Sequence, residues 1–99
     1  MNPNASVAIQ VLPEAQGEEI IRIVDEVIAF IKSTGLSCHV GPFETTIEGD
    51  YDELMEIVKN SQKICIQAGA PSVMSYVKIA YRPSQEGVWT IEKKVSKHS

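Results

Sequence analysis

Residues 37–54 read SCHVGPFETTIEGDYDEL, and this stretch decides the fold that the sequence predicts. Alternating and β-branched residues flank a Gly-Pro turn, which favours two short strands, Ser37–Gly41 and Glu44–Glu48, joined as a tight hairpin. Asp50 then occupies the N-cap position of a helix, with Glu53 three residues later as the partner of a capping box. The hairpin is therefore followed directly by a helix.

The segments on either side supply the remaining elements. Ser6–Leu12 alternates in polarity up to Pro13, which predicts a half-buried strand. Between Gly17 and Gly35, isoleucines and valines recur at helical spacing opposite charged residues, which predicts an amphipathic helix. Val73–Arg82 alternates again as a last strand, and apolar residues at helical spacing in the tail predict a short C-terminal helix.

The predicted order is strand, helix, strand, strand, helix, strand, the split βαβ arrangement of ferredoxin-like folds. Two right-handed crossovers place both main helices on one face of a four-stranded antiparallel sheet, with the first and third strands in its centre. We therefore predict an α+β, ferredoxin-like βαββαβ fold and a single domain over residues 1–99. One face of the sheet is expected to be left uncovered.

Composition narrows the classes of function. The chain is 43% hydrophobic with a net charge of -4 and has no run of Lys and Arg, which argues against nucleic acid as the main partner. No apolar stretch approaches the roughly 20 residues of a membrane span. The N-terminus also lacks the features of a signal peptide. We therefore expect a cytoplasmic protein that binds neither nucleic acid nor a membrane.

The sequence contains no motif of catalytic or metal chemistry. Cys38 and Cys65 lie in different predicted elements without a CxxC pattern, so both are expected to be reduced core residues. His39 has no His or Cys at ligand spacing, and no metal site is predicted. Catalytic triads, phosphate-binding glycine loops and zinc motifs are not found. We therefore expect a protein that is not an enzyme and uses no cofactor.

Strand alternation assigns side chains to the two faces of the sheet. The residues expected to face the helices are Val7, Ile9, Val11, Ile47, Val77 and Ile79. The residues expected on the helix-free face are Ser6, Ala8, Gln10, His39, Thr46, Glu48, Met74, Tyr76 and Lys78. Small residues on this face suit close approach by the sheet of a second chain, and closed symmetric dimers are the commonest assemblies, so we expect a homo-oligomer.

Glu48 is the candidate binding residue, and two interpretations stay open. It is either a solvated strand-end carboxylate helped by the dipole of the helix that begins just after it, or a ligand that accepts hydrogen bonds from a small molecule in a site bordered by Ser6, Gln10 and Thr46. An ion pair with Lys78 is not expected, because the first strand separates their strands by two spacings of roughly 4.8 Å. Lys78 could instead meet an anion or a neighbouring subunit. The aromatic rings elsewhere, those of Tyr76 and Trp89, suit either ligand stacking or packing.

Several segments together resemble a known family. They are the first strand with its Ser6, Gly41–Leu54 with TTIEGD at Thr45–Asp50, and VKI at Val77–Ile79 followed by Arg82. In these segments the chain resembles the thiamine-binding, YkoF-like family of small proteins, and the likeness covers nearly its whole length. The resemblance implies a subunit that dimerises through its sheet, commonly to a tetramer, and that binds thiamine or its hydroxymethylpyrimidine part without transforming it.

The resemblance also implies which residues touch the ligand. Thr46 and Glu48 come first, followed by Ser6 and Gln10. Thiamine has an aminopyrimidine edge of donors and acceptors and a cationic thiazolium, for which carboxylates, hydroxyls and aromatic rings are suitable partners. The acidic residue that the family carries after the VKI segment is missing here. The alternative from a different class is an oligomeric regulatory or structural interaction module with no small-molecule ligand.

Overall fold

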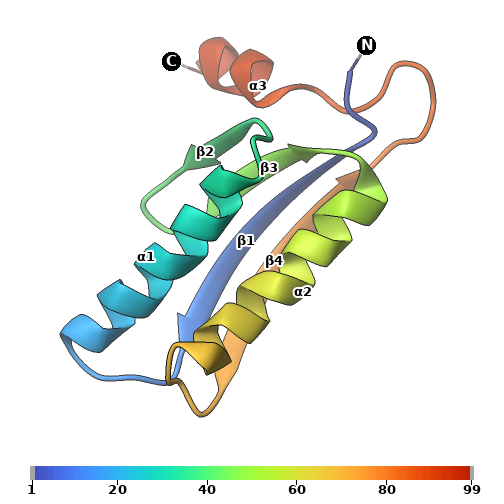
Figure 1. Cartoon of the computed structure of the whole chain (residues 1–99). Coiled ribbons are helices and arrows are strands. Elements are labelled where there is room, and N and C mark those ends of the chain that lie inside the picture. Colours follow the sequence, from blue (N-terminus) through green and yellow to red (C-terminus); the bar gives the residue numbers. More distant parts are fainter. Residues whose placement is uncertain (1, 99) are drawn as a thin grey trace.

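The computed structural model describes residues 2–98 and has the element order that the sequence predicts (Figure 1). The elements are β1 (Ala5–Pro13), α1 (Glu18–Ser33), β2 (Cys38–Val40), β3 (Thr45–Gly49), α2 (Tyr51–Gln67), β4 (Val73–Tyr81) and α3 (Ile91–His98). The α+β, ferredoxin-like fold is confirmed, and the predicted C-terminal helix is present.

The sheet has the strand order β2-β3-β1-β4, with β1 and β3 in the centre. α1 and α2 lie side by side over one of its faces (Figure 1). β1 pairs with β4 along its whole length, up to Pro13 with Val73. Its pairing with β3 stops earlier, at Ile9 with Thr45. Beyond Ile9, β1 therefore has a neighbouring strand on one side only.

Local signals set the helix boundaries. α1 begins after Gly17, whose φ of 57° lies in the left-handed region that favours glycine. At the start of α2, Asp50 Oδ2 accepts a hydrogen bond from the main-chain N–H of Glu53 at 3.4 Å, as an N-cap should. The return bond of a capping box, in which the Asp50 N–H donates to the Glu53 carboxylate, is not formed within residues 2–98. Asn4 instead supports this helix start, because its Oδ1 accepts from the Tyr51 N–H at 2.9 Å.

The hydrophobic core fills the space between the sheet and the two long helices. Its largest fully buried side chains are Val7, Ile23, Ile31, Ile47, Leu54 and Cys65. Each buried aliphatic side chain stabilises the fold by about 1.5–3 kcal/mol. Ile79 lies opposite Val7 in the register and therefore shares the helix-covered face of the sheet. It is nevertheless 50% exposed, because β4 is an edge strand that the helices cover only in part.

The two cysteines differ in burial. Both are free thiols, and Cys65 lies fully in the core. Cys38 is only half-buried because β2 is a short strand at the opposite edge of the sheet. The expectation that both are core residues is therefore confirmed for Cys65, whereas Cys38 packs against the core but is only partly buried.

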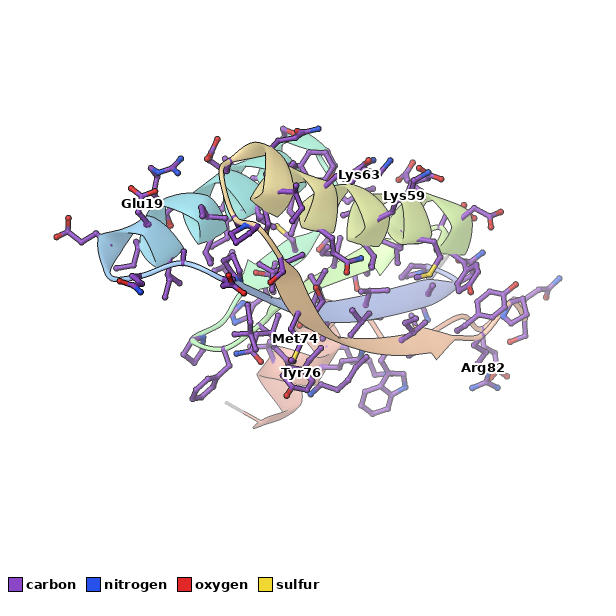
Figure 2. The ribbon with its side chains drawn as sticks, turned by 90° about the horizontal axis from the view of Figure 1, so that it is seen from below. Glu19, Lys59, Lys63, Met74, Tyr76 and Arg82 are labelled. Carbon is purple, nitrogen blue, oxygen red and sulfur yellow. The ribbon has the colours of Figure 1, made fainter. Side chains whose placement is uncertain are left out.

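The face of the sheet opposite α1 and α2 is not wholly uncovered. Figures 1 and 2 place α3 on that side, over one end of the sheet. Val88 and Ile91 are buried there, and the Val88 N–H donates to the carbonyl of Pro3 at 2.9 Å. The expectation of a fully open face is therefore wrong at this end. Within residues 2–98, no helix has the length and apolar character needed to cross a membrane.

Candidate functional site

The strand register confirms which side chains share the helix-free face, because directly opposite residues of paired strands point the same way. The rows that cross this face are Ala80–Ser6–Glu48, Lys78–Ala8–Thr46–His39, Tyr76–Gln10 and Met74–Leu12. Figure 2 shows Met74 and Tyr76 pointing away from the long helices. All the residues that the alternation assigned to this face, His39 included, lie on it.

Ser6 and Thr46 line an open hollow of about 270 Å³ on the helix-free face. Its other lining side chains include Lys78 from β4 and Lys94 from α3. Ser6 is 5% exposed, and its hydroxyl forms no hydrogen bond within residues 2–98. Every described side-chain oxygen or nitrogen that is sealed from solvent has a partner, so this hydroxyl reaches the hollow. The hollow thus offers hydroxyls and cationic groups to a ligand.

Glu48 lies beside this hollow, opposite Ser6 on the neighbouring strand. Its Oε2 accepts a hydrogen bond from the main-chain N–H of Ile91 at 2.7 Å, at the N-terminus of α3. Thr90 Oγ1 accepts from the Lys93 N–H at 3.1 Å and completes this helix start. The carboxylate is therefore held at a helix N-terminus as its simpler interpretation allowed, but the helix is α3 and not α2. Its Oε1 remains without a hydrogen bond from the described residues.

Lys78 has a partner within the chain. Its Nζ lies 3.1 Å from Glu44 Oε1, just before β3, and reaches it across β1 at the small residue Ala8. Among the described residues, Lys78 pairs with Glu44 and not with Glu48. A sequence signal for this contact exists, because Glu44 continues the alternation of Thr46 and Glu48 on the same face.

Gln10 lies apart from the other three predicted site residues. It lines a second cavity, of about 200 Å³, where the β2–β3 hairpin separates from β1. Apolar side chains of α1 and the hairpin form most of the wall, and Glu44 and Thr45 add polar groups. The structure therefore brings Ser6, Thr46 and Glu48 together at the α3 end of the face. It places Gln10 at a different cavity, which the sequence did not reveal.

This arrangement of groups suits binding. Neither the Ser6 nor the Thr46 hydroxyl is hydrogen-bonded to a His or a carboxylate within residues 2–98. In the same part of the chain, no group of three or more His, Cys, Asp or Glu side chains is placed to hold a metal ion.

Comparison with known proteins shows the family of the chain. The model of the family described as "Thiamine-binding protein" matches residues 7–99. The chain belongs to this family. A relative in Clostridium perfringens, named only as a UPF0045 protein, is 47% identical over 93 residues, which cover 94% of this chain and 95% of the relative.

Two solved structures resemble the chain closely. A Bacillus cereus domain of unknown function, DUF77, has 38% identity and a TM-score of 0.88 over 100% of this chain and 93% of its own. A Thermotoga maritima protein assigned provisionally to thiamine biosynthesis or salvage has 34% identity and a TM-score of 0.83, over 96% of this chain and 98% of its own.

Proposed function

We propose that this protein binds thiamine or its hydroxymethylpyrimidine part and releases it unchanged. Membership of the thiamine-binding protein family carries this proposal. The site chemistry supports it, because the helix-free face presents two hydroxyls and one oxygen of the Glu48 carboxylate that have no hydrogen bond from the described residues. Such groups suit the donors and acceptors of an aminopyrimidine.

We assign Ser6, Gln10, Thr46 and Glu48 to the border of the ligand. Ser6 and Thr46 contribute hydroxyls, and the Oε1 of Glu48 contributes an acceptor, while its Oε2 holds α3. Gln10 approaches the ligand from the side of the second cavity. No catalytic step and no cofactor belong to this proposal.

We further propose that the subunit assembles through its helix-free face into a homodimer or homotetramer in the cytoplasm. Leu12, Met74 and Tyr76 are large, exposed and adjacent on that face, at the end opposite to α3. A contiguous apolar surface of this kind marks an interaction site. The alternative function, an interaction module without a ligand, is favoured by the same surface and predicts assembly alone.

Isothermal titration of the purified protein with thiamine and with hydroxymethylpyrimidine tests the proposal. We expect saturable heat with at least one of them, and no saturation at high micromolar concentration of either would leave the interaction module as the function. Glu48→Gln is the informative variant, because a glutamine oxygen can still accept from the Ile91 N–H while the charge is lost. Asp52→Asn, an exposed change on α2, is the control. Equal affinities for both variants would remove the Glu48 charge from the site.

A thermal-shift screen separates the two functions independently of heat signals. A ligand that binds only the folded state stabilises it by about 2.7 kcal/mol at a concentration of 100 times Kd. The binding function predicts such a rise with thiamine or hydroxymethylpyrimidine. The interaction module predicts none.

A further inference from the structure

The second cavity lies against the edge of β1, and the direction of the main-chain groups there can be read from the ladder. In an antiparallel sheet, the N–H and C=O of successive residues face alternate neighbours. Asn4 O accepts from Arg82 N and Glu14 N donates to Ser72 O, both on the β4 side. The main-chain N–H and C=O groups of even-numbered residues of β1 therefore point toward β4. Those of odd-numbered residues point toward β3.

Val11 is the first odd-numbered residue of β1 that has no partner strand on the β3 side. The ladder between β1 and β3 ends at the pair Ile9 and Thr45. If the register continued, Val11 would lie opposite Phe43. Phe43 instead lies in the hairpin turn and is 77% exposed. Neither the N–H nor the C=O of Val11 has a hydrogen bond within the described residues. Val11 lines the cavity, so both groups border it.

The residue that carries these unpaired groups is largely buried. Val11 is 9% exposed, and buried main-chain N–H groups without any partner are rare in native proteins because they carry a desolvation cost. Thr45, which also lines the cavity, is 6% exposed and its hydroxyl has no hydrogen bond within the described residues. A donor, an acceptor and a hydroxyl thus meet at one apolar cavity. The rest of its wall includes Val24, Val27 and Ile31 of α1.

We infer that this cavity binds a planar nitrogen heterocycle whose edge carries an acceptor next to a donor, as a 4-aminopyrimidine does. The Val11 N–H donates to the ring nitrogen, the Val11 C=O accepts from the exocyclic amine, and the Thr45 hydroxyl adds a further contact. This inference rests on the proposed function and deepens it, because it assigns the pyrimidine ring its own site.

The size of the cavity limits what enters it. Pockets for drug-sized ligands have roughly 300–1,000 Å³. The cavity has about 200 Å³, which suits one ring and not both rings of thiamine. Glu44 lines the cavity and is paired with Lys78, which lines the hollow on the helix-free face. The remainder of a larger ligand therefore lies outside the cavity.

A further β-strand is not the occupant. Only Val11 and Pro13 face the empty side of β1, and proline has no N–H to donate. An added strand would gain one donor from β1 and would have to displace the α1 and hairpin side chains that form the wall. A compact ring needs only the single donor and acceptor of Val11.

Thr45 and Thr46 are a matched pair for the first test, because they are neighbours on opposite faces of the sheet. Thr45→Val and Thr46→Val each remove one hydroxyl at nearly constant volume. With hydroxymethylpyrimidine as the probe, Thr45→Val should weaken binding roughly two- to tenfold, the effect of one hydrogen bond. Thr46→Val, at the hollow on the opposite face, should weaken it less than Thr45→Val does. A loss confined to Thr46→Val would overturn the inference and leave the proposed function standing.

The second test observes the cavity directly. In ¹⁵N-labelled protein, hydroxymethylpyrimidine should shift the Val11 amide resonance and slow its hydrogen exchange, and 2-methylpyrimidine, which lacks the amine, should bind at least tenfold more weakly. Val24→Phe fills the cavity and should abolish the shift, whereas Ile21→Phe, on the exposed side of the same helix, should not. Thermal unfolding checks that both variants are folded.

The outcomes separate the two proposals. Saturable binding of hydroxymethylpyrimidine without any change at Val11 would overturn the inference alone. A Val11 shift with 4-aminopyrimidine, in a protein that binds neither thiamine nor hydroxymethylpyrimidine, would support the cavity and overturn the proposed function. No change at Val11 with any of these probes would overturn the inference.

Discussion

The carboxylate of Glu48 accepts a hydrogen bond from the main-chain N–H of Ile91 at 2.7 Å. This contact joins the end of β3 to the first turn of α3, which lies over the helix-free face. A negative charge at a helix N-terminus is favourable by about 0.3–1 kcal/mol, and it also satisfies an N–H that the helix leaves unpaired. Glu48 thus positions the element that borders the proposed site.

Removal of the Glu48 side chain should release α3. We expect Glu48→Ala to lower the free energy of unfolding by about 1–2 kcal/mol and to speed hydrogen exchange of the amides in the first turn of α3. Urea denaturation and hydrogen exchange measured by mass spectrometry give the two quantities. Glu56→Ala, in an exposed ion pair on α2, is the control. Unchanged exchange in α3 would show that Val88 and Ile91 hold the helix without the carboxylate.

The contact also shows which part of the fold the sequence could predict. Alternation and helical periodicity are local signals, and they predicted each element to within a few residues, including Thr45–Gly49 and Tyr51–Gln67. The position of α3 depends on a contact between Glu48 and Ile91, which are far apart in the sequence. Helical spacing in the tail indicates an amphipathic helix but not the surface on which it packs.

The candidate site shows the same limit at the hairpin. Alternation assigned Ser6, Thr46 and Glu48 to one face correctly, because the side-chain period of a strand is fixed. It could not show that the ladder between β1 and β3 ends at Ile9, since the conformation of the turn decides where the strands separate. The unpaired main chain of Val11 follows from that separation.

Arg22 links the two long helices, and its contribution should depend on pH. Its Nη2 donates to Glu19 Oε2 and to the carbonyl of Ala68 at the end of α2, both at 2.7 Å. The hydrogen bond and the charge of Arg22 lower the pKa of Glu19. A lowered pKa in the folded state gives stability that is present above the unfolded pKa, about 4.3, and is lost as the pH falls through the folded value. Arg22→Leu should therefore cost more stability at neutral than at acidic pH.

Urea denaturation of the wild type and Arg22→Leu at a series of pH values measures this difference. Part of it should persist in acid, because the bond to the Ala68 carbonyl does not titrate. Lys59→Leu, which breaks a longer exposed pair of 3.8 Å, is the control and should show a smaller change. A difference for Arg22→Leu that stays constant with pH would contradict the role of Glu19.

The two thiols should differ in reactivity. Burial raises the pKa of Cys65, so less of the reactive thiolate is present at a given pH, whereas Cys38 is half-buried at the sheet edge. In native Cys38→Ser, a disulfide reagent should react slowly with Cys65, and in native Cys65→Ala it should react faster with Cys38. Reaction of Cys65 at the rate of the unfolded chain would contradict its burial.

The raised pKa of Cys65 also makes the free energy of unfolding depend on pH. The unfolded state loses this proton first as the pH rises, so the folded state loses relative stability above the ordinary thiol pKa of about 8.5. Wild type should therefore lose more stability between neutral and alkaline pH than Cys65→Ala does. Parallel stability curves for the two proteins would contradict this expectation.

Met74 should be central to assembly of the subunit. It is exposed on the helix-free face, directly opposite Leu12 and two residues from Tyr76. A charge placed in such an interface must be desolvated without a partner, which costs several kcal/mol. We expect Met74→Glu to reduce the mass measured by light scattering to that of one subunit, while Ile66→Glu, at an exposed position of α2, leaves the wild-type mass unchanged. A wild-type protein that is already monomeric, or a Met74→Glu variant that keeps the wild-type mass, would show that this face does not carry the assembly.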